Sequence, residues 1–315
     1  MSGADKDGTF TSTGSQGGTE LMLAGLKKYA DPKLLNQFNI ICSRVRHVDP
    51  KKKNILWLHD LWQDPEASHL RDARNLGKFD KLVFVSNYQQ STYNIGLGVP
   101  YSAGVVMQNA IESFPYHEKP DPEDTINLIY HTTPHRGLEL LVPVFVEIAE
   151  QLPNIHLDVF SSFKAYGWED RDKPYQELFD ICRNHPQITY HGFQPNDVVR
   201  EALKKSHIFA YPSIWTETSC IAVIEAMAAG CDVICPTLGA LPETAANFAY
   251  LYPYTENVND HAVLFANILY DKIVSYSSKE LRSRRVQQAM YFNAIYNWQY
   301  RADQWNNLLT YLLRK

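Results

Sequence analysis

The second half of the chain alternates short apolar runs with longer segments whose apolar residues recur at helical spacing. Short runs rich in branched residues are typical of buried strands, and longer amphipathic segments are typical of helices. A regular alternation of the two predicts a doubly wound parallel sheet. The expected order is strand 126–130, helix 138–152, strand 156–160, helix 175–184, strand 188–191, helix 196–206 and a strand ending at Tyr211.

The first half contains fewer predicted strands. An α/β half normally begins with a buried strand that leads into its first glycine-rich loop. Only Phe10 is bulky before Gly17. We therefore expect that the first domain lacks this opening strand or that the chain starts after it. The predicted strands are 38–42, 55–58 and 82–85, and an amphipathic segment covers 21–29.

A linker is predicted between the two halves. Residues 115–124, PYHEKPDPED, are rich in proline and in charge, which is typical of a hinge. We place the boundary here, with a first domain at 1–118 and a second at 119–297. Beyond Leu241 the chain is predicted to be mostly helical, and its last segment, 298–312, has an aromatic and leucine-rich face.

Length and composition narrow the class of protein. With 315 residues, of which 45% are hydrophobic, the chain can form two cores. A net charge of −5 disfavours nucleic-acid binding, because no basic field covers the molecule. No run of about 18 apolar residues is present, and the N-terminus is polar. We expect a soluble, unsecreted, cytoplasmic protein.

The five cysteines form no Cys-x-x-Cys pair, and their number is odd. They are predicted to be reduced packing residues, as in a cytosolic protein. Cys231 and Cys235 lie on one face of a predicted strand, where core packing is favoured over a metal half-site. No metal site and no cofactor are predicted.

The most informative stretch is 211–236, YPSIWTETSCIAVIEAMAAGCDVICP. A strand, a loop, a helix and a second strand are expected here, with Glu217 in the loop and Glu225 in the helix. Eight positions apart, the two carboxylates would diverge by roughly 80° on one helix. That suits two contacts on one extended ligand better than a shared metal. The alternative is an exposed loop residue and a solvated helix residue.

Three residues between these carboxylates are expected at the helix N-terminus. Backbone N–H groups and hydroxyls there form a natural anion site. A carboxylate, an anion site and a second carboxylate in series match a nucleotide sugar, with its hexose hydroxyls, diphosphate and ribose. The three residues are Thr218, Ser219 and Cys220.

This stretch resembles the Glu-x7-Glu signature of family 4 retaining glycosyltransferases, from the preceding Pro-Ser to the strand after Gly230. The resemblance implies the GT-B fold, an α/β architecture of two Rossmann-like domains facing across a cleft. It also implies that the terminal helix, 298–315, packs back on the first domain. The departure lies at 218–220, where the family has a bulkier residue followed by Gly. It concerns the preference for the donor sugar.

Two further segments resemble the donor diphosphate site of that family. Gly17-Gly18 matches its Gly-Gly-x-Glu loop, where glycine lets the backbone approach a phosphate closely; an ordinary turn is the alternative. In IYHTTPHRG, Arg136 stands at the position of the family's lysine, and His131 at that of its arginine. A neutral imidazole would neutralise less charge, and a packing or capping histidine remains the alternative for His131.

Strand-end residues supply the remaining candidates. His59 ends a buried strand, and the resemblance implies contact with the donor sugar; Asp60 either orients its imidazole or caps the next turn. Gly192-Phe193 resembles the Gly-Phe that borders the nucleotide base. Ser161 is a weaker candidate for the same pocket, with a turn as the alternative.

Taken together, the resemblance implies a metal-independent retaining glycosyltransferase. Its donor would be a nucleoside diphosphate sugar, and its acceptor a carbohydrate or a lipid-linked glycan. A peripheral membrane contact is compatible with the second acceptor, and the oligomeric state is open. A nucleotide-sugar epimerase of the same fold and a non-catalytic nucleotide-sugar binding module are the alternatives. The predicted catalytic residues are Glu217, His59 and Arg136.

Overall fold

The computed structural model describes residues 17–115, 119, 122 and 124–315. Two compact units divide the chain: unit 1 is Met1–Ser113, Glu217–Ile221 and Ala294–Lys315, and unit 2 is Phe114–Thr216 and Ala222–Asn293. Phe10 and the stretch before Gly17, where an opening strand was expected to be lacking, lie outside the described residues. The segment Glu217–Ile221 thus belongs to unit 1, although the strand before it and most of the helix after it belong to unit 2.

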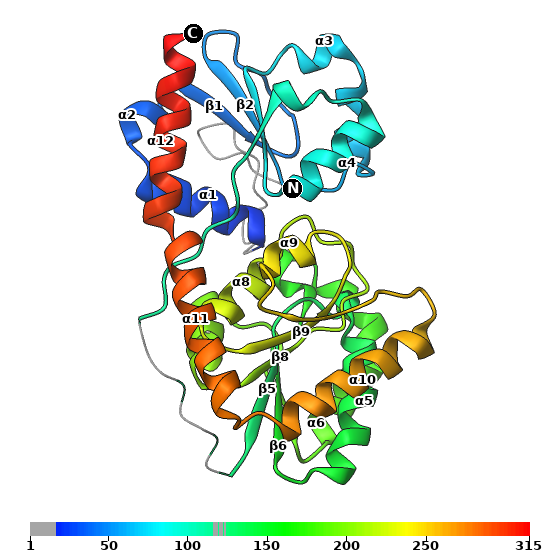
Figure 1. Cartoon of the computed structure of the whole chain (residues 1–315). Coiled ribbons are helices and arrows are strands. Elements are labelled where there is room, and N and C mark those ends of the chain that lie inside the picture. Colours follow the sequence, from blue (N-terminus) through cyan, green and yellow to red (C-terminus); the bar gives the residue numbers. More distant parts are fainter. Residues whose placement is uncertain (1–16, 116–118, 120–121, 123) are drawn as a thin grey trace. The chain divides into compact units, whose positions relative to one another are not determined.

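Unit 1 is built on a four-stranded parallel sheet with the order β1-β2-β3-β4 (Figure 1). The three strands predicted from apolar runs are confirmed as β1 to β3. In the register, Leu58 pairs with Phe84, and Phe84 pairs with Val106, so these strands end side by side. The strands are β1 (Phe38–Cys42), β2 (Lys53–Leu58), β3 (Lys81–Phe84) and β4 (Gly104–Val106).

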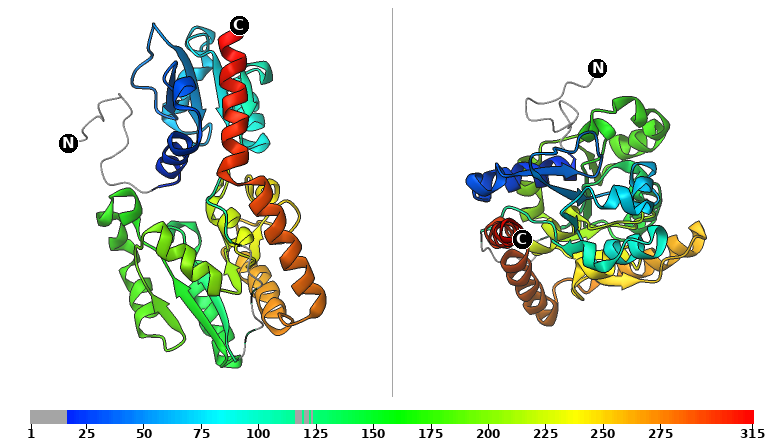
Figure 2. Two further views of the ribbon diagram at one scale, coloured as in Figure 1. Left: turned by 90° about the vertical axis from the view of Figure 1, so that its left-hand side faces the viewer. Right: turned by 90° about the horizontal axis from the view of Figure 1, so that it is seen from above.

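Helices α1 and α12 pack together in unit 1 and form a core with one face of its sheet (Figure 2). Trp57 of β2 and Trp305 of α12 lie in this core with ring centroids 4.9 Å apart. A Cβ on Gly25 would lie 2.0 Å from the Trp298 ring, so only glycine allows this approach. The helices are α1 (Gly18–Tyr29), α2 (Pro32–Leu35), α3 (Ala73–Leu76), α4 (Asn87–Leu97) and α12 (Trp298–Arg314).

Unit 2 contains a six-stranded parallel sheet with the order β10-β9-β8-β5-β6-β7. The order reverses between β5 and β8, which makes this point the topological switch of a doubly wound sheet. Strand β10 was not predicted, because this three-residue strand lies between two helices in the region beyond Leu241 that was expected to be mostly helical. The strands are β5 (Ile126–Tyr130), β6 (Ile155–Val159), β7 (Ile188–Tyr190), β8 (Ile208–Ala210), β9 (Asp232–Pro236) and β10 (Tyr250–Tyr252).

The strands of unit 2 alternate with helices, as the apolar pattern predicted. Among the described residues, no helix combines the length and the apolar character needed to cross a membrane. The helices are α5 (Leu138–Gln151), α6 (Gln176–Asn184), α7 (Asn196–Lys205), α8 (Ile221–Ala228), α9 (Leu241–Ala245), α10 (Val258–Val274) and α11 (Lys279–Ile295). Short 3-10 turns cover Pro65–Arg71, Tyr101–Ala103, Pro134–Arg136, Phe163–Tyr166 and Glu169–Tyr175.

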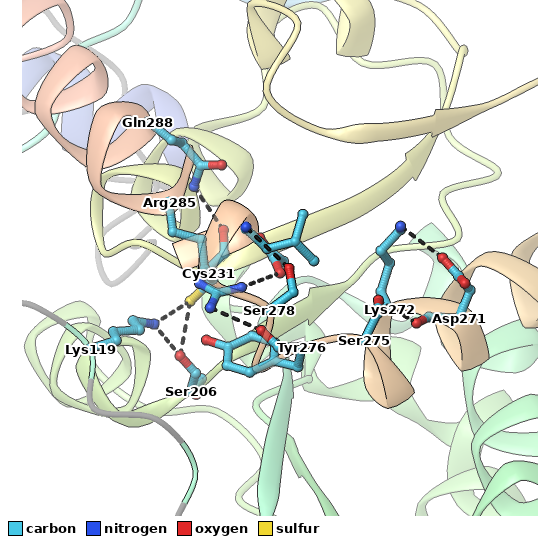
Figure 3. Close-up of polar contacts among 12 residues, drawn as sticks. Lys119, Ser206, Cys231, Asp271, Lys272, Ser275, Tyr276, Ser278, Arg285 and Gln288 are labelled. Atoms are coloured by element: carbon cyan, nitrogen blue, oxygen red, sulfur yellow. Dashed lines mark hydrogen bonds and ion pairs between the residues drawn. The ribbon is translucent and has the colours of Figure 1, made fainter. Parts of the chain in front are cut away.

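A buried polar cluster surrounds the amino end of β9 (Figure 3). Arg285 of α11 pairs with Asp232 at 3.1 Å, and burial raises the pKa of that carboxyl. Gln288 donates to the Cys231 carbonyl at 2.8 Å. Lys119 Nζ contacts Cys231 Sγ at 2.9 Å, and burial lowers the pKa of this lysine. These contacts hold α11 and Lys119, a residue of the predicted linker, at the amino end of β9.

The five cysteines are free thiols, as predicted, and four of them are buried. Burial raises the pKa of Cys235 to about 12, so it is a thiol at neutral pH. Cys231 directly precedes β9 and Cys235 lies within it, and both are fully buried. They serve as core residues.

Candidate functional site

The loops after β5 and β8 meet at the topological switch point of unit 2. Gly137, after β5, has a left-handed backbone with φ of 112°. A Cβ at this position would lie 2.1 Å from the Pro212 carbonyl oxygen of the loop after β8. Only glycine therefore allows this approach, and any ligand at the switch point lies beside both loops.

His131 directly follows β5 and packs against Phe209, with ring centroids 4.5 Å apart. Burial lowers the pKa of its imidazole to about 3, and a hydrogen bond with the Ala222 backbone opposes this only in part. The ring is therefore neutral at pH 7. Its buried Nε2 has no hydrogen-bond partner among the described residues. His131 thus offers a hydrogen-bonding atom, not a charge.

Three hydroxyls share this condition. Thr132 Oγ1, Thr133 Oγ1 and Ser161 Oγ are buried without a hydrogen-bond partner in the described part of the chain. They follow β5 and β6, which are neighbours in the sheet. An unsatisfied buried polar group costs about 1–3 kcal/mol, so a ligand that pairs with these atoms recovers that cost. We did not predict Thr132 or Thr133, although two hydroxyl residues after a strand were visible in the sequence.

Arg136 lies in the turn after β5, as expected, and an aromatic ring accompanies it. Its guanidinium carbon lies 5.9 Å from the centroid of the Trp215 ring, within cation–π range. His135 packs against the same indole at 4.9 Å. Trp215, which is 44% exposed and belongs to the loop after β8, was not among the predicted residues. Through this contact, Arg136, the candidate for phosphate binding, lies next to the loop that leads to Glu217.

Glu225 lies in α8 and is only 5% exposed, so the alternative of a solvated helix residue is wrong. Its Oε1 accepts a hydrogen bond from Arg200 Nη1 at 3.1 Å, and its carboxylate accepts from Asn196 Nδ2 at 3.2 Å. Burial raises the pKa of Glu225, and the Arg200 guanidinium opposes that rise. The two partners on α7 hold the carboxylate in one orientation. No sequence signal indicated them.

The loops after β6 and β7 are bonded to each other. Tyr190 OH donates to the Ser161 carbonyl at 2.8 Å, and His191 stacks on Phe160 with centroids 4.2 Å apart. Gly192 has a left-handed backbone, with φ of 62°, which positions the half-buried Phe193 after it. Unit 2 therefore gathers His131, Arg136, Ser161, Gly192, Phe193 and Glu225 into one polypeptide unit.

In unit 1, the segment Glu217–Ile221 is held at the carboxyl ends of the strands. Thr218 Oγ1 donates to the carbonyl of His59, after β2, at 2.8 Å. Ser86 Oγ, after β3, donates to the Thr218 carbonyl at 2.6 Å, and Asn109 Nδ2, after β4, donates to the Ser219 carbonyl at 3.4 Å. Three neighbouring strand ends thus fix the backbone of this segment.

Glu217 is 5% exposed, so the alternative of a surface loop residue is also wrong. Cys220 is likewise buried. The glycine loop lies beside the same segment, because a Cβ on Gly18 would approach Ile221 Cδ1 to 3.1 Å. Gly17 is the N-cap of α1 and provides no side-chain cap. The backbone at the start of α1 is therefore close to the segment that carries Glu217.

His59 directly follows β2 and packs against Trp57, with ring centroids 4.7 Å apart. Burial lowers the pKa of its imidazole to about 3, and its Nε2 has no hydrogen-bond partner among the described residues. The Asp60 side chain bonds to Ser43, and burial raises the pKa of this carboxyl. His59 is therefore positioned by packing and by its backbone, whose N–H donates to Ser43 Oγ at 2.9 Å.

The match to a known family covers most of unit 2. The family model described as Glycosyl transferases group 1 matches residues 110–289. A phosphatidylinositol N-acetylglucosaminyltransferase subunit of Arabidopsis thaliana is 25% identical over 173 residues, which are 54% of this chain and 37% of that protein. The human protein of the same name is 26% identical over 143 residues, 44% of this chain and 28% of that protein. The matched regions thus span well under half of these relatives.

Solved structures resemble nearly the whole chain. A glycosyltransferase from Rickettsia africae has a TM-score of 0.68 at 14% identity, over 94% of this chain and 82% of that one. The GtfA/B complex has a TM-score of 0.65 at 14% identity, over 94% and 61%. HepE of Anabaena, solved with UDP and glucose, has a TM-score of 0.60 at 16% identity, over 82% and 72%. The chain belongs to the group 1 glycosyl transferases, family 4, and has the α/β GT-B fold with two parallel sheets.

Proposed function

We propose that the protein is a retaining glycosyltransferase that moves a sugar from a nucleoside diphosphate donor to a hydroxyl of a carbohydrate or a lipid-linked glycan. One observation carries the proposal: buried polar atoms with no hydrogen-bond partner among the described residues follow β5 and β6 at the switch point of unit 2, where Arg136 also lies. Doubly wound sheets bind nucleotides at this point. A ligand with many hydrogen-bonding groups satisfies those atoms, and a nucleotide sugar is such a ligand.

The nucleotide is assigned to unit 2. Glu225 accepts hydrogen bonds from the ribose hydroxyls, since Arg200 and Asn196 fix its carboxylate and leave it acceptor positions. Gly192 and Phe193 border the base. Arg136 pairs with the diphosphate through its guanidinium fork.

The neutral groups around Arg136 complete the phosphate site. Hydroxyls of Thr132 and Ser161 donate to phosphate oxygens, and His131 contributes a hydrogen bond without a charge. In unit 1, the backbone at Gly17-Gly18 and at Thr218, Ser219 and Cys220 offers N–H groups of the same kind. Fixed donors of this type stabilise the charge that grows on the departing diphosphate, as electrostatic preorganisation does in other enzymes.

The chemistry then follows the family resemblance. The acceptor oxygen attacks the anomeric carbon on the face that the diphosphate leaves, so one C–O bond forms as another breaks. The acceptor proton passes to an oxygen of the departing phosphate. Glu217 accepts hydrogen bonds from hydroxyls of the transferred sugar, and His59 contacts the same sugar. Neither residue forms a covalent intermediate.

The relatives suggest which donor to test first. The plant and human relatives are named as N-acetylglucosaminyltransferase subunits, and HepE was solved with UDP and glucose. We therefore propose a UDP-sugar, with UDP-N-acetylglucosamine and UDP-glucose as the first candidates. The replacement of the family's arginine by the neutral His131 favours, as a second candidate function, a module that binds this donor without transferring the sugar.

Thermal unfolding and nucleotide release test the proposal together. A bound donor raises the free energy of unfolding by about 2.7 kcal/mol at a hundred times its Kd, so Tm rises with donor concentration. Arg136→Ala should abolish this rise. Arg74→Ala, which removes an exposed arginine paired with Asp72, should keep it. Release of UDP from the donor separates an enzyme from a binding module. Folded wild-type protein whose Tm no nucleotide sugar changes would contradict the whole assignment.

A further inference from the structure

Arg200 of α7, which holds the Glu225 carboxylate, also lies over an aromatic ring. Its guanidinium carbon is 3.8 Å from the centroid of the Phe114 ring, well inside cation–π range. Phe114 is 4% exposed and the Arg200 side chain 13%, so water screens this contact little. The cation that pairs with Glu225 therefore has a second contact, with a buried ring face.

The ring determines how Arg200 meets its carboxylate. Arg200 Nη1 donates to Glu225 Oε1 at 3.1 Å. One hydrogen bond sets a distance but does not fix the plane of the guanidinium, whereas stacking on an aromatic face does. The direction from which Arg200 reaches Oε1 also decides which lone pairs of that oxygen remain for a ligand.

Phe114 is itself held by the helix that carries Glu225. The Phe114 N–H donates to Asn293 Oδ1 at 2.7 Å, and Asn293 Nδ2 donates to the Ala228 carbonyl at 2.8 Å. Ala228 is the last residue of α8. The contacts form a closed circuit that begins and ends on α8 and passes through Arg200. The Phe114 ring thus keeps a fixed position relative to the Glu225 carboxylate.

The circuit lies where the chain enters and leaves unit 2. Phe114 is the first residue of that unit, and Asn293 is the last. Phe114 also directly precedes the predicted linker, 115–124, and lies more than 100 residues before the Glu-x7-Glu segment. The start of unit 2 therefore contributes to the position of a carboxylate that we assign to the nucleotide.

We propose that Phe114 is a positioning residue of the donor site: its ring sets the orientation of Arg200, and Arg200 sets the carboxylate of Glu225 for the ribose hydroxyls. This inference rests on the proposed function. Phe114 acts through Arg200 and does not touch the nucleotide. Its removal therefore weakens the contact with ribose and leaves the contact between Arg136 and the diphosphate intact.

Deoxynucleotides test the role of Phe114. The probes are UDP, 2′-deoxy-UDP and 3′-deoxy-UDP, measured by calorimetric titration. In the wild type, at least one deoxy form should bind about 10- to 100-fold more weakly than UDP, the loss expected when a hydroxyl no longer donates to a charged acceptor. Phe114→Leu keeps an apolar side chain without a ring face. It should lower the affinity for UDP about 5- to 30-fold and that for this deoxy form less than about threefold.

Two further variants show whether the effect passes through Arg200. Phe114→Tyr keeps the ring face, so it should retain most of the discrimination between UDP and the deoxy form. Arg200→Gln keeps an N–H donor but removes the cation. In that background, Phe114→Leu should change the discrimination less than about twofold. Additive losses in the double variant would mean that Phe114 does not act through Arg200, and would overturn the inference.

A buried phenylalanine elsewhere in unit 2 provides the matched control. Phe265 of α10 is fully buried and packs against Tyr252, with ring centroids 6.1 Å apart. Phe265→Leu should lower Tm and leave the ratio of the affinities for UDP and the deoxy form unchanged. With the UDP-sugar as substrate, Phe114→Leu should raise KM and change kcat less than about threefold.

The outcomes separate the inference from the proposed function. If the wild type binds neither UDP nor a UDP-sugar, the proposed function fails, and the role of Phe114 fails with it. If the wild type binds UDP and prefers it to the deoxy form, but Phe114→Leu keeps that preference as Phe265→Leu does, the inference alone is overturned. Equal binding of UDP and both deoxy forms by the wild type also overturns it, because no ribose contact would then depend on Glu225.

Discussion

In each of the two sheets, one strand is directly followed by a histidine, and the two histidines have similar environments. His59 follows β2 in unit 1, and His131 follows β5 in unit 2. Each ring packs against an aromatic neighbour, each imidazole has its pKa lowered to about 3 by burial, and each Nε2 lacks a partner among the described residues. Both strand ends therefore offer a neutral hydrogen-bonding group to a ligand.

The surroundings of the two histidines differ. In unit 2 the strand order reverses at β5, and the loops after β5 and β6 contain buried hydroxyls that find no partner in the described part of the chain. In unit 1 the strands follow in simple order, and their ends bind the backbone of Glu217–Ile221. Unit 2 thus presents buried polar atoms where we propose that the nucleotide binds, whereas unit 1 uses its strand ends mainly to hold a segment of its own chain.

Separate substitution of Glu217 and Glu225 should distinguish the roles of the two units most strongly. Glu217→Gln should lower kcat about 100- to 1,000-fold, as loss of a group that acts on the transition state does, and change donor Kd little. Glu225→Gln should instead weaken donor binding about tenfold, because ribose hydroxyls lose a charged acceptor. Steady-state kinetics and calorimetric titration with the donor measure the two effects. The opposite pattern would contradict the division between the units.

A smaller effect is expected at Trp215, which the structure places over Arg136 in unit 2. A cation–π contact at an exposed site contributes about 0.5–1 kcal/mol, so Trp215→Ala should lower donor affinity roughly two- to fivefold. Trp215→Phe should restore most of the loss. Trp168→Ala removes an equally exposed indole that pairs with Arg171, and it should leave donor affinity unchanged. Equal losses in the two alanine variants would mean that Trp215 does not position Arg136.

Most strands could be predicted because buried parallel strands are continuous apolar runs, as in 126–130 and 55–58. Strand β10 could not, because Tyr250–Tyr252 lies between two helices in a region whose pattern is mostly helical. The assignment of Glu217–Ile221 to unit 1 could not be predicted either. A local pattern defines the helix that follows, but not which strand ends bind the loop.

The positions of candidate residues were predicted where a short motif defines them: Glu225 lies in a helix and Gly17-Gly18 at a helix start, as expected, while their roles stay predictions. It was missed where partners meet only in the folded chain. Arg200 lies 25 residues from Glu225, and nothing in the sequence of α7 shows which face meets α8. Thr132 was readable as a polar residue after a strand. Its importance depends on its burial and on the lack of a partner among the described residues, which only the structure shows.

The weakest test of the comparison is the dependence of stability on pH. Both histidines have a folded-state pKa of about 3, below the ordinary value of 6.5. Between these values the unfolded chain binds protons that the folded chain does not, so the free energy of unfolding falls as pH decreases from 6.5 towards 3. His59→Gln and His131→Gln should each make this dependence shallower, and the double variant should make it shallower still. Urea unfolding at several pH values measures the slopes, with the exposed His47→Gln as the control. If only one of these two variants changed the slope of the free energy of unfolding against pH, the two strand ends would not be equivalent. The histidine whose replacement had no effect would then be the one that water reaches.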